Sequence, residues 1–332
     1  MNEQFDLISI GDATIDVFIA PSEREALCML DDQKQLICFN YGDKIPVKSL
    51  EFSMGGNAAN NAVGCTRLGI KTTIVLTVGG DDIGNQLLSH LKNEGVDTSF
   101  VIQQTAARSN YSTVITYGGE RTIFVYHAPR SYEFPIELPS TPWVYLTSMG
   151  ESFRPFYNHA LEWLDKNPEI KLAFNPGTHQ LRADPEILMP VMRRTNVIFV
   201  NRQEAEKLTK TDSETRGKER VLLESLSGLG PKICVITDGS SGSYIYDGKR
   251  FVHAEVMPID AYERTGAGDA FGSGCLSALI KGKTLEEALL WGTLNSASVI
   301  SYTGAQRGLI KENDLPEWIE RAKSSNVKVE EI

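Results

Sequence analysis

Residues 263–280, ERTGAGDAFGSGCLSALI, carry the strongest structural and chemical signal in this chain. Gly266 and Gly268 let the backbone turn tightly, and the small residues after them favour a helix over 266–281. The first N–H groups of such a helix point outward with the positive end of its dipole behind them, which suits phosphate oxygens. Asp269, in the first turn, is placed to accept the proton of an attacking hydroxyl group. The pattern also fits a plain helix start in which an acidic residue balances the dipole.

Two better-known phosphate-binding motifs are excluded. A dinucleotide fingerprint needs a third glycine, and that position holds Phe271. Residues 64–72, GCTRLGIKT, approach a Walker A loop but have one residue too many before Lys71. Their expected helix–turn–strand context is also the reverse of a P-loop. A dehydrogenase and a P-loop enzyme are therefore both disfavoured.

A second small-residue stretch lies near the N-terminus. Residues 55–69, GGNAANNAVGCTRLG, have apolar residues at helical spacing, and Gly69 has the position of a C-terminal helix cap. Taken alone, the start of this stretch fits a capped helix, with Asn57 near the cap.

Strand and helix patterns alternate along most of the chain. Short apolar runs typical of buried strands are separated by helical patterns; they are FDLISIGD at the start, Thr73–Val78, Trp143–Thr147, Lys171–Phe174, Val197–Val200 and Ile233–Thr237. This alternation predicts βαβ units and an α/β fold with a doubly wound, mostly parallel sheet and helices on both faces.

Several β-like segments interrupt this pattern. They lie near 36–40 and 44–53, and in a hairpin pattern over 111–127 around Gly118-Gly119. We expect them to form a small sheet that projects from the main domain. The charged stretch 22–34 is expected to be an exposed loop or helix.

The composition excludes several classes of protein. The 332 residues carry a net charge near −10, which argues against a nucleic-acid surface because phosphate backbones need clustered Lys and Arg. The five cysteines are scattered, so neither a disulfide framework nor a zinc site is indicated. The N-terminus lacks a signal-peptide pattern, and no apolar run approaches the ~18 residues that cross a bilayer. We expect a soluble, cytoplasmic protein with no membrane partner.

Two motifs together resemble a known family. TGAGDAF (265–271) and MGGNAANNAVGCTRLG (54–69) are similar to the two signatures of the ribokinase-like, or PfkB, family of sugar and nucleoside kinases. Further matches follow in family order, from GDATID at 11–16 to TGAQ at 303–306. The resemblance implies a single ribokinase-like kinase domain over 1–332, with a β-sheet lid from segments at about 12–20, 36–53 and 108–128. It also implies a possible homodimer through the lid.

The resemblance assigns roles to residues of both signatures. Asp269 matches the catalytic base, and Asp16 matches the carboxylate that grips substrate hydroxyls. The anion hole matches Gly266, Ala267 and Gly268, and the substrate-binding loop matches Gly55, Gly56, Asn57 and Asn60. A carboxylate with side-chain amides offers the acceptors and donors that a polyol needs.

The nucleotide side of the family's site matches two other motifs. In NRQE, Asn201 and Glu204 correspond to residues that help to hold the nucleotide phosphates and hydrated Mg²⁺, with Glu204 acting through water. In TDGSSG, Thr237, Gly239 and Gly242 correspond to the nucleotide loop. Each has a plainer interpretation, as a helix capping pair for NRQE and a turn for TDGSSG.

Two asparagines are weaker candidates. Asn295 is a candidate for facing the adenine. Asn175, followed by Pro176-Gly177, comes directly after a strand, and ligands of α/β sheets bind at the carboxyl ends of strands. We therefore expect Asn175 to line the cleft.

The chain departs from the family pattern in two places. Where many members have Asp-Thr before the Thr-Gly-Ala-Gly-Asp core, it has Glu263-Arg264, so binding of an activating potassium-like ion is uncertain. Ribokinases proper have Lys at the position of Asn57, which loosens the match to ribose. In the lid segment, Arg108 or Arg121 is a candidate for meeting an acidic substrate.

The resemblance therefore implies an ATP- and Mg²⁺-dependent kinase that phosphorylates a hydroxyl group, in particular a hydroxymethyl group, of a sugar such as ribose. A nucleoside such as adenosine is the alternative acceptor. A rival from another class is a non-catalytic sugar- or nucleotide-binding regulator, against which the intact TGAGD motif argues.

Overall fold

A large mixed sheet forms the centre of the protein. The computed structural model describes residues 4–22, 27–31, 34–117, 120–211 and 217–332. Within these residues, ten strands pair in the order β16-β15-β14-β13-β12-β11-β10-β1-β6-β7. Their bounds are β1 Leu7–Ile10, β6 Thr72–Gly79, β7 Asp97–Gln104, β10 Trp143–Thr147, β11 Lys171–Asn175, β12 Val197–Asn201, β13 Ile233–Thr237, β14 Ser243–Tyr246, β15 Phe251–Ala254 and β16 Val329–Glu331.

The strand order gives the sheet a switch point. Strands from β7 to β13 are parallel, and β14, β15 and β16 complete the sheet in antiparallel pairs. The chain leaves β1 toward β6 and β7 on one side, and continues from β10 toward β13 on the other. The sheet is therefore doubly wound, as predicted, and its switch point lies between β1 and β10. Ligands of such sheets bind at the carboxyl ends of the strands beside this point.

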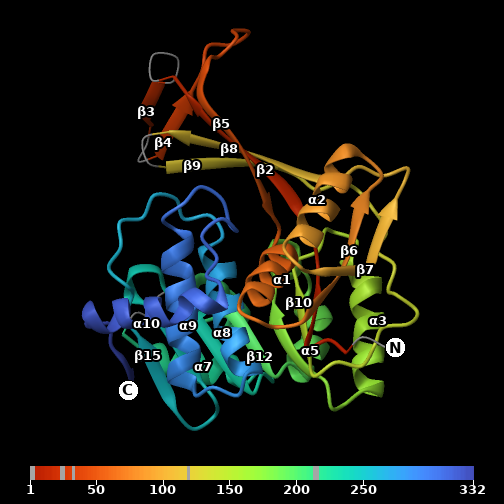
Figure 1. Cartoon of the computed structure of the whole chain (residues 1–332), viewed down its shortest axis with the longest axis vertical. Helices are drawn as coiled ribbons and strands as arrows, with labels where there is room; N and C mark the ends of the chain where they lie inside the picture. Colours follow the sequence, from red (N-terminus) through yellow and green to blue (C-terminus); the bar gives the residue numbers. More distant parts are fainter. Residues whose placement is uncertain (1–3, 23–26, 32–33, 118–119, 212–216) are drawn as a thin grey trace.

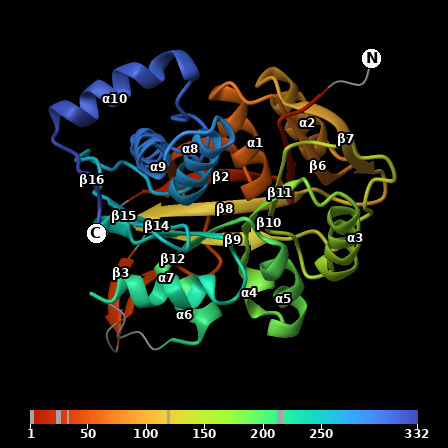
Figure 2. The same ribbon diagram turned by 90° about the horizontal axis from the view of Figure 1, so that it is seen from below.

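Helices cover both faces of the sheet (Figure 2). The strand β10 shows why: Val144 and Leu146 pack into the apolar layer under α3, α5, α6 and α7, while Trp143 and Tyr145 pack toward α8, α9 and α10. The helices are α1 Asn57–Arg67, α2 Asp82–Asn93, α3 Phe153–Lys166, α4 Thr178–Arg182, α5 Pro185–Arg194, α6 Arg202–Thr209, α7 Glu219–Ser227, α8 Ala267–Ile280, α9 Leu285–Val299 and α10 Leu315–Ser324.

A second, smaller sheet extends over one end of the large one (Figure 1). Its strands are β2 Thr14–Pro21, β5 Val47–Gly55, β8 Asn110–Tyr117 and β9 Glu120–Tyr126, in the order β5-β2-β8-β9. We call these four strands the lid sheet. Asp16 and Phe18 share its inner face, which approaches the large domain where Gly304 lies against Ser53 and Phe18. A separate hairpin, β3 Leu27–Asp31 and β4 Lys34–Cys38, stands beside it.

The expected second sheet is confirmed for residues 47–53 and for the hairpin of β8 and β9. The turn residues of this hairpin, 118–119, lie outside the described residues. The prediction is wrong for the segment near 36–40, because β4 pairs with β3 in the separate hairpin instead. The prediction of a loop or helix over 22–34 is wrong for 27–31, which form a strand. The apolar run over 27–30 is short and lies between charged residues, so it shows no clear strand or helix period. Residues 23–26 and 32–33 of that stretch lie outside the description.

The helices that the structure describes include none with the length and apolar character needed to span a membrane.

Candidate active site

Two glycine turns deliver two helix starts to the same place. Gly266 precedes α8 with φ +78°, and a Cβ there would lie 2.3 Å from the Cβ of Ala305. Gly56 precedes α1 with φ +93°, and a Cβ there would lie 2.5 Å from the Cα of Ala13. Both turns need glycine, because an L side chain rarely adopts this conformation and would collide with backbone or a methyl group.

The helices α1 and α8 then pack closely enough for their polar side chains to meet. A Cβ at Gly64 in α1 would lie 2.3 Å from the Oγ of Ser273 in α8. One turn nearer the helix starts, the Nδ2 of Asn60 donates a hydrogen bond of 2.8 Å to the Oδ2 of Asp269. The two signature motifs are therefore joined through the expected catalytic base.

Asp269 has the environment of a general base. Burial raises the pKa of its carboxyl to about 6, and the hydrogen bond from Asn60 opposes this rise. A carboxyl with a pKa in this range is ionised at neutral pH, yet it is a stronger base than an ordinary Asp.

Asp16 reaches the same region from the lid sheet. Burial raises its pKa to about 6; a hydrogen bond with Ser112 lowers the pKa, while the charges of Asp269 and Glu263 raise it. Gly55 leaves room for this carboxylate, since a Cβ at that position would lie 2.3 Å from the Oδ2 of Asp16. The lid sheet thus contributes a second carboxylate with a raised pKa close to Asp269.

A cavity of about 230 Å³ opens in front of the α8 N-terminus. Its walls come from the ends of the strands β11, β12 and β13 and from the two signature turns. The residues predicted for the site that line it are Asn57, Asn201, Glu204, Thr237, Gly266, Ala267, Gly268 and Asp269. Backbone donors of a helix start, a carboxylate base and polar side chains therefore share one cavity, as phosphoryl transfer requires.

The prediction that Asn175 lines this cavity is confirmed. It ends β11, and its Oδ1 accepts hydrogen bonds from the Nδ2 of Asn57 at 3.4 Å and the hydroxyl of Tyr145 at 3.2 Å. Its Nδ2 donates to the carbonyl of Phe199 at 2.7 Å. Asn175 therefore ties the first signature to the central sheet. Its place at a strand end was the signal that identified it.

Asn201 and Glu204 form the capping pair that the sequence predicted. The Oδ1 of Asn201 accepts from the Glu204 N–H, and the Oε2 of Glu204 accepts from the Asn201 N–H, both at 2.9 Å. Burial raises the pKa of Glu204, the Asn201 N–H lowers it and the charge of Asp269 raises it again. The cap holds the Glu204 carboxylate at the cavity wall, so the local role and a role toward a ligand are compatible.

A buried arginine, which the sequence did not indicate, links NRQE to the TDGSSG loop. The Nε of Arg202 lies 2.8 Å from the Oδ2 of Asp238, and its Nη2 lies 2.8 Å from the Oε1 of Glu219. Within the loop, Thr237 lines the cavity, while Gly242 has a structural reason to be glycine: a Cβ there would lie 2.1 Å from the carbonyl of Ala254. A Cβ at Gly239 would meet nothing within 4 Å.

Residues 6–312 match the sequence model of the pfkB family carbohydrate kinases. The chain belongs to the PfkB family. This confirms the prediction of an enzyme that transfers a phosphoryl group to an alcohol of a carbohydrate.

Proteins similar to this chain match nearly its whole length. The ATP-dependent 6-phosphofructokinase of Thermoanaerobacterium thermosaccharolyticum is 25% identical over 92% of this chain and 90% of its own length. The structure of Arabidopsis thaliana ribokinase complexed with ribose and ATP superposes with a TM-score of 0.79 at 19% identity, covering 96% and 99% of the two chains. The nucleoside kinase of Methanocaldococcus jannaschii gives 0.75 at 21% identity, covering 97% and 99%. At these identities the two structures establish the ribokinase-like fold alone.

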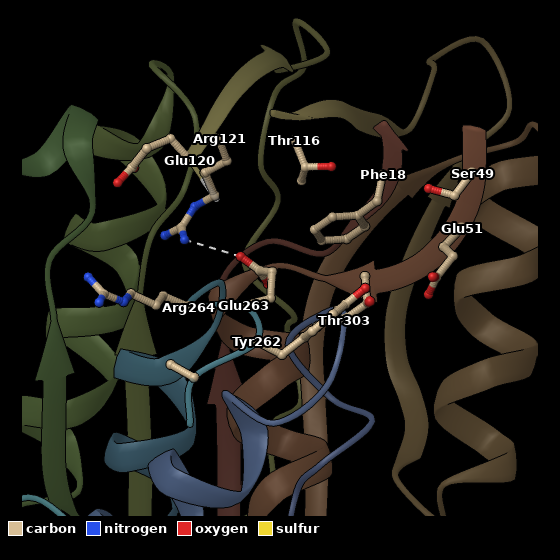
Figure 3. A pocket seen from close by; sticks show the side chains of 11 residues that line it. Phe18, Ser49, Glu51, Thr116, Glu120, Arg121, Tyr262, Glu263, Arg264 and Thr303 are labelled. Atoms are coloured by element: carbon tan, nitrogen blue, oxygen red, sulfur yellow. Dashed lines mark hydrogen bonds and ion pairs between the residues drawn. The ribbon is translucent and has the colours of Figure 1, made fainter. Parts of the chain in front are cut away.

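One part of this PfkB site departs from the family pattern that the sequence resembles. Figure 3 shows a second cavity, of about 300 Å³, between the lid sheet and residues 261–264. There the Oε1 of Glu263 accepts hydrogen bonds from the backbone N–H and hydroxyl of Thr265, at 2.8 and 2.6 Å, and lies 3.1 Å from the Nη1 of Arg121. The Glu263 side chain is only 8% exposed. The guanidinium of Arg121, from the lid sheet, therefore neutralises the Glu263 carboxylate, which in turn holds the turn before α8 through Thr265.

The prediction that Asn295 faces the adenine is wrong. Asn295 is buried between α8 and α9. Its Nδ2 donates to the carbonyl of Ala270 at 2.8 Å and to the Oγ of Ser273 at 3.1 Å, and its Oδ1 accepts from the Ile310 N–H at 2.9 Å. Its amide joins α8 and α9 to the loop after α9. These bonds give a buried polar side chain the partners that it needs.

Proposed function

We propose that this PfkB-family kinase transfers the terminal phosphoryl group of ATP to a hydroxyl group, in particular a hydroxymethyl group, of a sugar such as ribose. The observation that carries the proposal is the contact of Asn60 with Asp269 at the α8 N-terminus, together with the cavity that Asp269, Asn201 and Glu204 line. This arrangement unites a half-buried carboxylate proposed as the base, an anion-binding turn and polar groups for a nucleotide.

The residues divide the work as follows. Asp16 and residues 55–60 bind acceptor hydroxyls, because carboxylate and amide groups supply both acceptors and donors. Asp269 takes the proton from the attacking hydroxyl, and the N–H groups of Gly266, Ala267 and Gly268 stabilise the negative charge that grows on the transferring group. Closure of the lid sheet excludes water, which would otherwise compete as acceptor.

Mg²⁺ fits the nucleotide side of the cavity through a single carboxylate. The described residues contain no cluster of three or more His, Cys, Asp or Glu side chains that would hold a metal alone. Mg²⁺ usually keeps several waters and binds through one or two carboxylates and substrate phosphates, so Glu204 is the residue we assign to it, through water. When bound, the ion would neutralise phosphate charge.

Three alternatives remain for the acceptor and the class of protein. A nucleoside is the second candidate acceptor, supported by the fold shared with a nucleoside kinase. A sugar phosphate or sugar acid is the third, supported by the phosphofructokinase relative and by Arg121 beside the second cavity. A non-catalytic regulator is disfavoured because such a protein has no need for a carboxylate with a raised pKa at a helix start that lines the cavity.

The test is an ATP-consumption assay with Mg²⁺ against pentoses, hexoses, sugar acids, sugar phosphates and nucleosides. We expect turnover that depends on one class of added alcohol, with ribose or a related sugar first. ATP binding without turnover on any member of the panel would favour the binding-protein alternative.

The acid limb of the pH profile is a first prediction. Asp269 works only as a carboxylate, and its pKa is about 6, so kcat should fall as the pH drops below about 6 and level off above about 7. The pKa of Asp16 is also about 6, so its protonation should weaken acceptor binding over the same pH range. Initial rates between pH 4.5 and 8.5 at saturating substrates would check this. A kcat independent of pH down to 5 would contradict an Asp269 base.

A second prediction concerns monovalent cations. We propose that the Arg121 guanidinium replaces an activating ion at Glu263, so activity in potassium and in tetramethylammonium buffers should agree within about twofold. Arg121→Met should lower kcat/KM roughly 10-fold, the effect of losing about 1.4 kcal/mol of transition-state positioning. Strong potassium dependence of the unaltered enzyme would contradict the proposal. Arg154→Met, at an exposed arginine of α3, is the control.

A third prediction concerns the homodimer. Leu50, Phe52, Phe124 and Tyr126 are exposed apolar side chains on the lid sheet, on its edge strands β5 and β9. We propose that a second copy covers them, since an exposed apolar edge strand favours pairing. Phe52→Asp with Phe124→Asp should convert the dimer to a monomer in sedimentation velocity. Val221→Asp, at an exposed apolar residue of α7, should leave it dimeric. A monomeric unaltered protein at micromolar concentration would sink the proposal.

A further inference from the structure

A line of four side chains connects the molecular surface to Asp269. The Nε2 of His90 in α2 lies 2.7 Å from the Oε1 of Gln306, in the loop after α9. The Nε2 of Gln306 donates to the Oδ1 of Asn60 at 2.8 Å, and the Nδ2 of Asn60 donates to the Oδ2 of Asp269 at 2.8 Å. Each distance is that of a good hydrogen bond. The four residues come from four different segments of the chain.

The chemistry of the amides fixes the direction of this line. An ionised carboxylate only accepts, so Asn60 must present its NH₂ group to Asp269 and its oxygen to Gln306. Gln306 must then present its own NH₂ group to Asn60 and its oxygen to His90. The Nε2 of His90 therefore carries the hydrogen, whatever the charge of the ring. In all three hydrogen bonds the donor is the residue farther from Asp269.

The middle of the line is buried and its outer end is accessible. Gln306 and Asn60 are each 3% exposed. His90 is partly exposed and lines a shallow surface groove on α2. The backbone around Gln306 is held separately, because its carbonyl accepts from the Nη1 of Arg67 at 2.7 Å. A change in the Gln306 side chain can therefore be made without releasing the loop.

We infer that Gln306 and His90 are positioning residues for the catalytic base: they orient the Asn60 amide, which holds one oxygen of Asp269 and leaves the other for the acceptor hydroxyl. The inference rests on the proposed role of Asp269. It adds to the substrate-binding role expected for Asn60, since Nδ2 has a second hydrogen that this contact does not use. Hydrogen bonds in a chain polarise one another, so loss of an outer link weakens the inner one.

The other charged and titratable groups that face the two ends of the line are not members of it. Asp16 from β2, Glu204 from α6 and Tyr145 from β10 interact electrostatically with Asp269, and Arg264 lines the same cavity. At the outer end, Glu94 interacts with His90. None of these groups is changed by a substitution at Gln306.

The central test is Gln306→Leu, which keeps the approximate volume and removes both hydrogen bonds. Because a hydrogen bond to the carboxylate favours its ionised form, the acid limb of kcat should move to higher pH by roughly half a unit to one unit. The maximal kcat should fall roughly 10-fold, less than the ~100-fold or more expected for loss of the base itself, with KM for ATP and acceptor changed less than about twofold.

Asn295→Leu is the matched control, because it removes another buried amide that is hydrogen-bonded to the same loop after α9 but has no contact in the line. Both variants should lower the melting temperature, but only Gln306→Leu should move the acid limb. His90→Phe should move it in the same direction by less. The double variant His90→Phe/Gln306→Leu should match Gln306→Leu alone, because residues of one line do not act additively.

A second readout separates this inference from the proposed function. Carboxyl carbon NMR of protein labelled at Asp, with Asp269→Asn to assign the signal, reports the pKa of Asp269 whether or not it is the base. A raised Asp269 pKa in Gln306→Leu supports the line of hydrogen bonds. An unchanged Asp269 pKa overturns it, as would equal shifts in the Asn295→Leu control. Undiminished turnover of Asp269→Asn would instead refute the assignment of the base.

Discussion

Asp269→Asn is expected to lower kcat at least about 100-fold, because it removes the group that accepts the hydroxyl proton. The substitution keeps the shape of the side chain, and its amide oxygen can still accept from the Nδ2 of Asn60. ATP binding should therefore persist. The measurement is steady-state turnover on the acceptor found in the panel, with ATP affinity by calorimetry.

Folding of this variant should be intact, and the pH dependence of stability supplies the control. The pKa of Asp269 is about 6 in the folded protein and near 3.8 when unperturbed, so the folded state binds the proton more tightly. Stability from this group is complete below the unfolded pKa and declines as the pH rises through about 6. Asn cannot ionise, so at pH 8 Asp269→Asn should melt no lower than the unaltered protein. Full turnover in this variant would rule out the base.

Gly268→Ala is expected to lower kcat roughly 100-fold by blocking the anion-binding turn, an effect comparable to the loss of one oxyanion donor. A Cβ at Gly268 would meet no protein atom within 4 Å, and Gly268 lines the cavity. The added methyl group therefore projects into the space proposed for the transferring phosphoryl group. Turnover and KM for ATP would be measured together.

Gly272→Ala is the matched control for that experiment. Gly272 lies in the same helix, and a Cβ there would meet only the hydroxyl of Tyr145, at 4.0 Å. Alanine favours a helix interior over glycine by up to about 1 kcal/mol, so both variants should be at least as stable as the unaltered protein. Equal activity of the two variants would exclude a phosphate at Gly268.

Local patterns in the sequence were enough for much of the fold. Parallel strands buried on both faces are continuous apolar runs, so β10, β11, β12 and β13 were recognised almost to the residue. The Asn201–Glu204 cap was predictable because its partners are three residues apart. The strand at 27–31 was missed, since a short apolar run between charged residues has no strong period.

The polar contacts across the site were beyond the sequence. Arg121 and Glu263 are separated by 142 positions, and Gln306 and Asn60 by 246. Neither Arg121 nor Gln306 has a neighbour in sequence that indicates its partner. Asn295 was assigned the wrong role for the same reason. The sequence made its amide a candidate for contacting adenine, but the packing of two helices buries it.

The sequence by itself therefore determined the periodic elements and the glycine turns, and it indicated the residue proposed as the base, because each depends on residues within a few positions of one another. Only the tertiary structure decided which distant side chains surround that base. The pKa of Asp269 depends on burial and on the amide of Asn60, and both arise when α1 packs against α8. Burial and long-range hydrogen bonding are properties of the packed chain, and no local pattern encodes them.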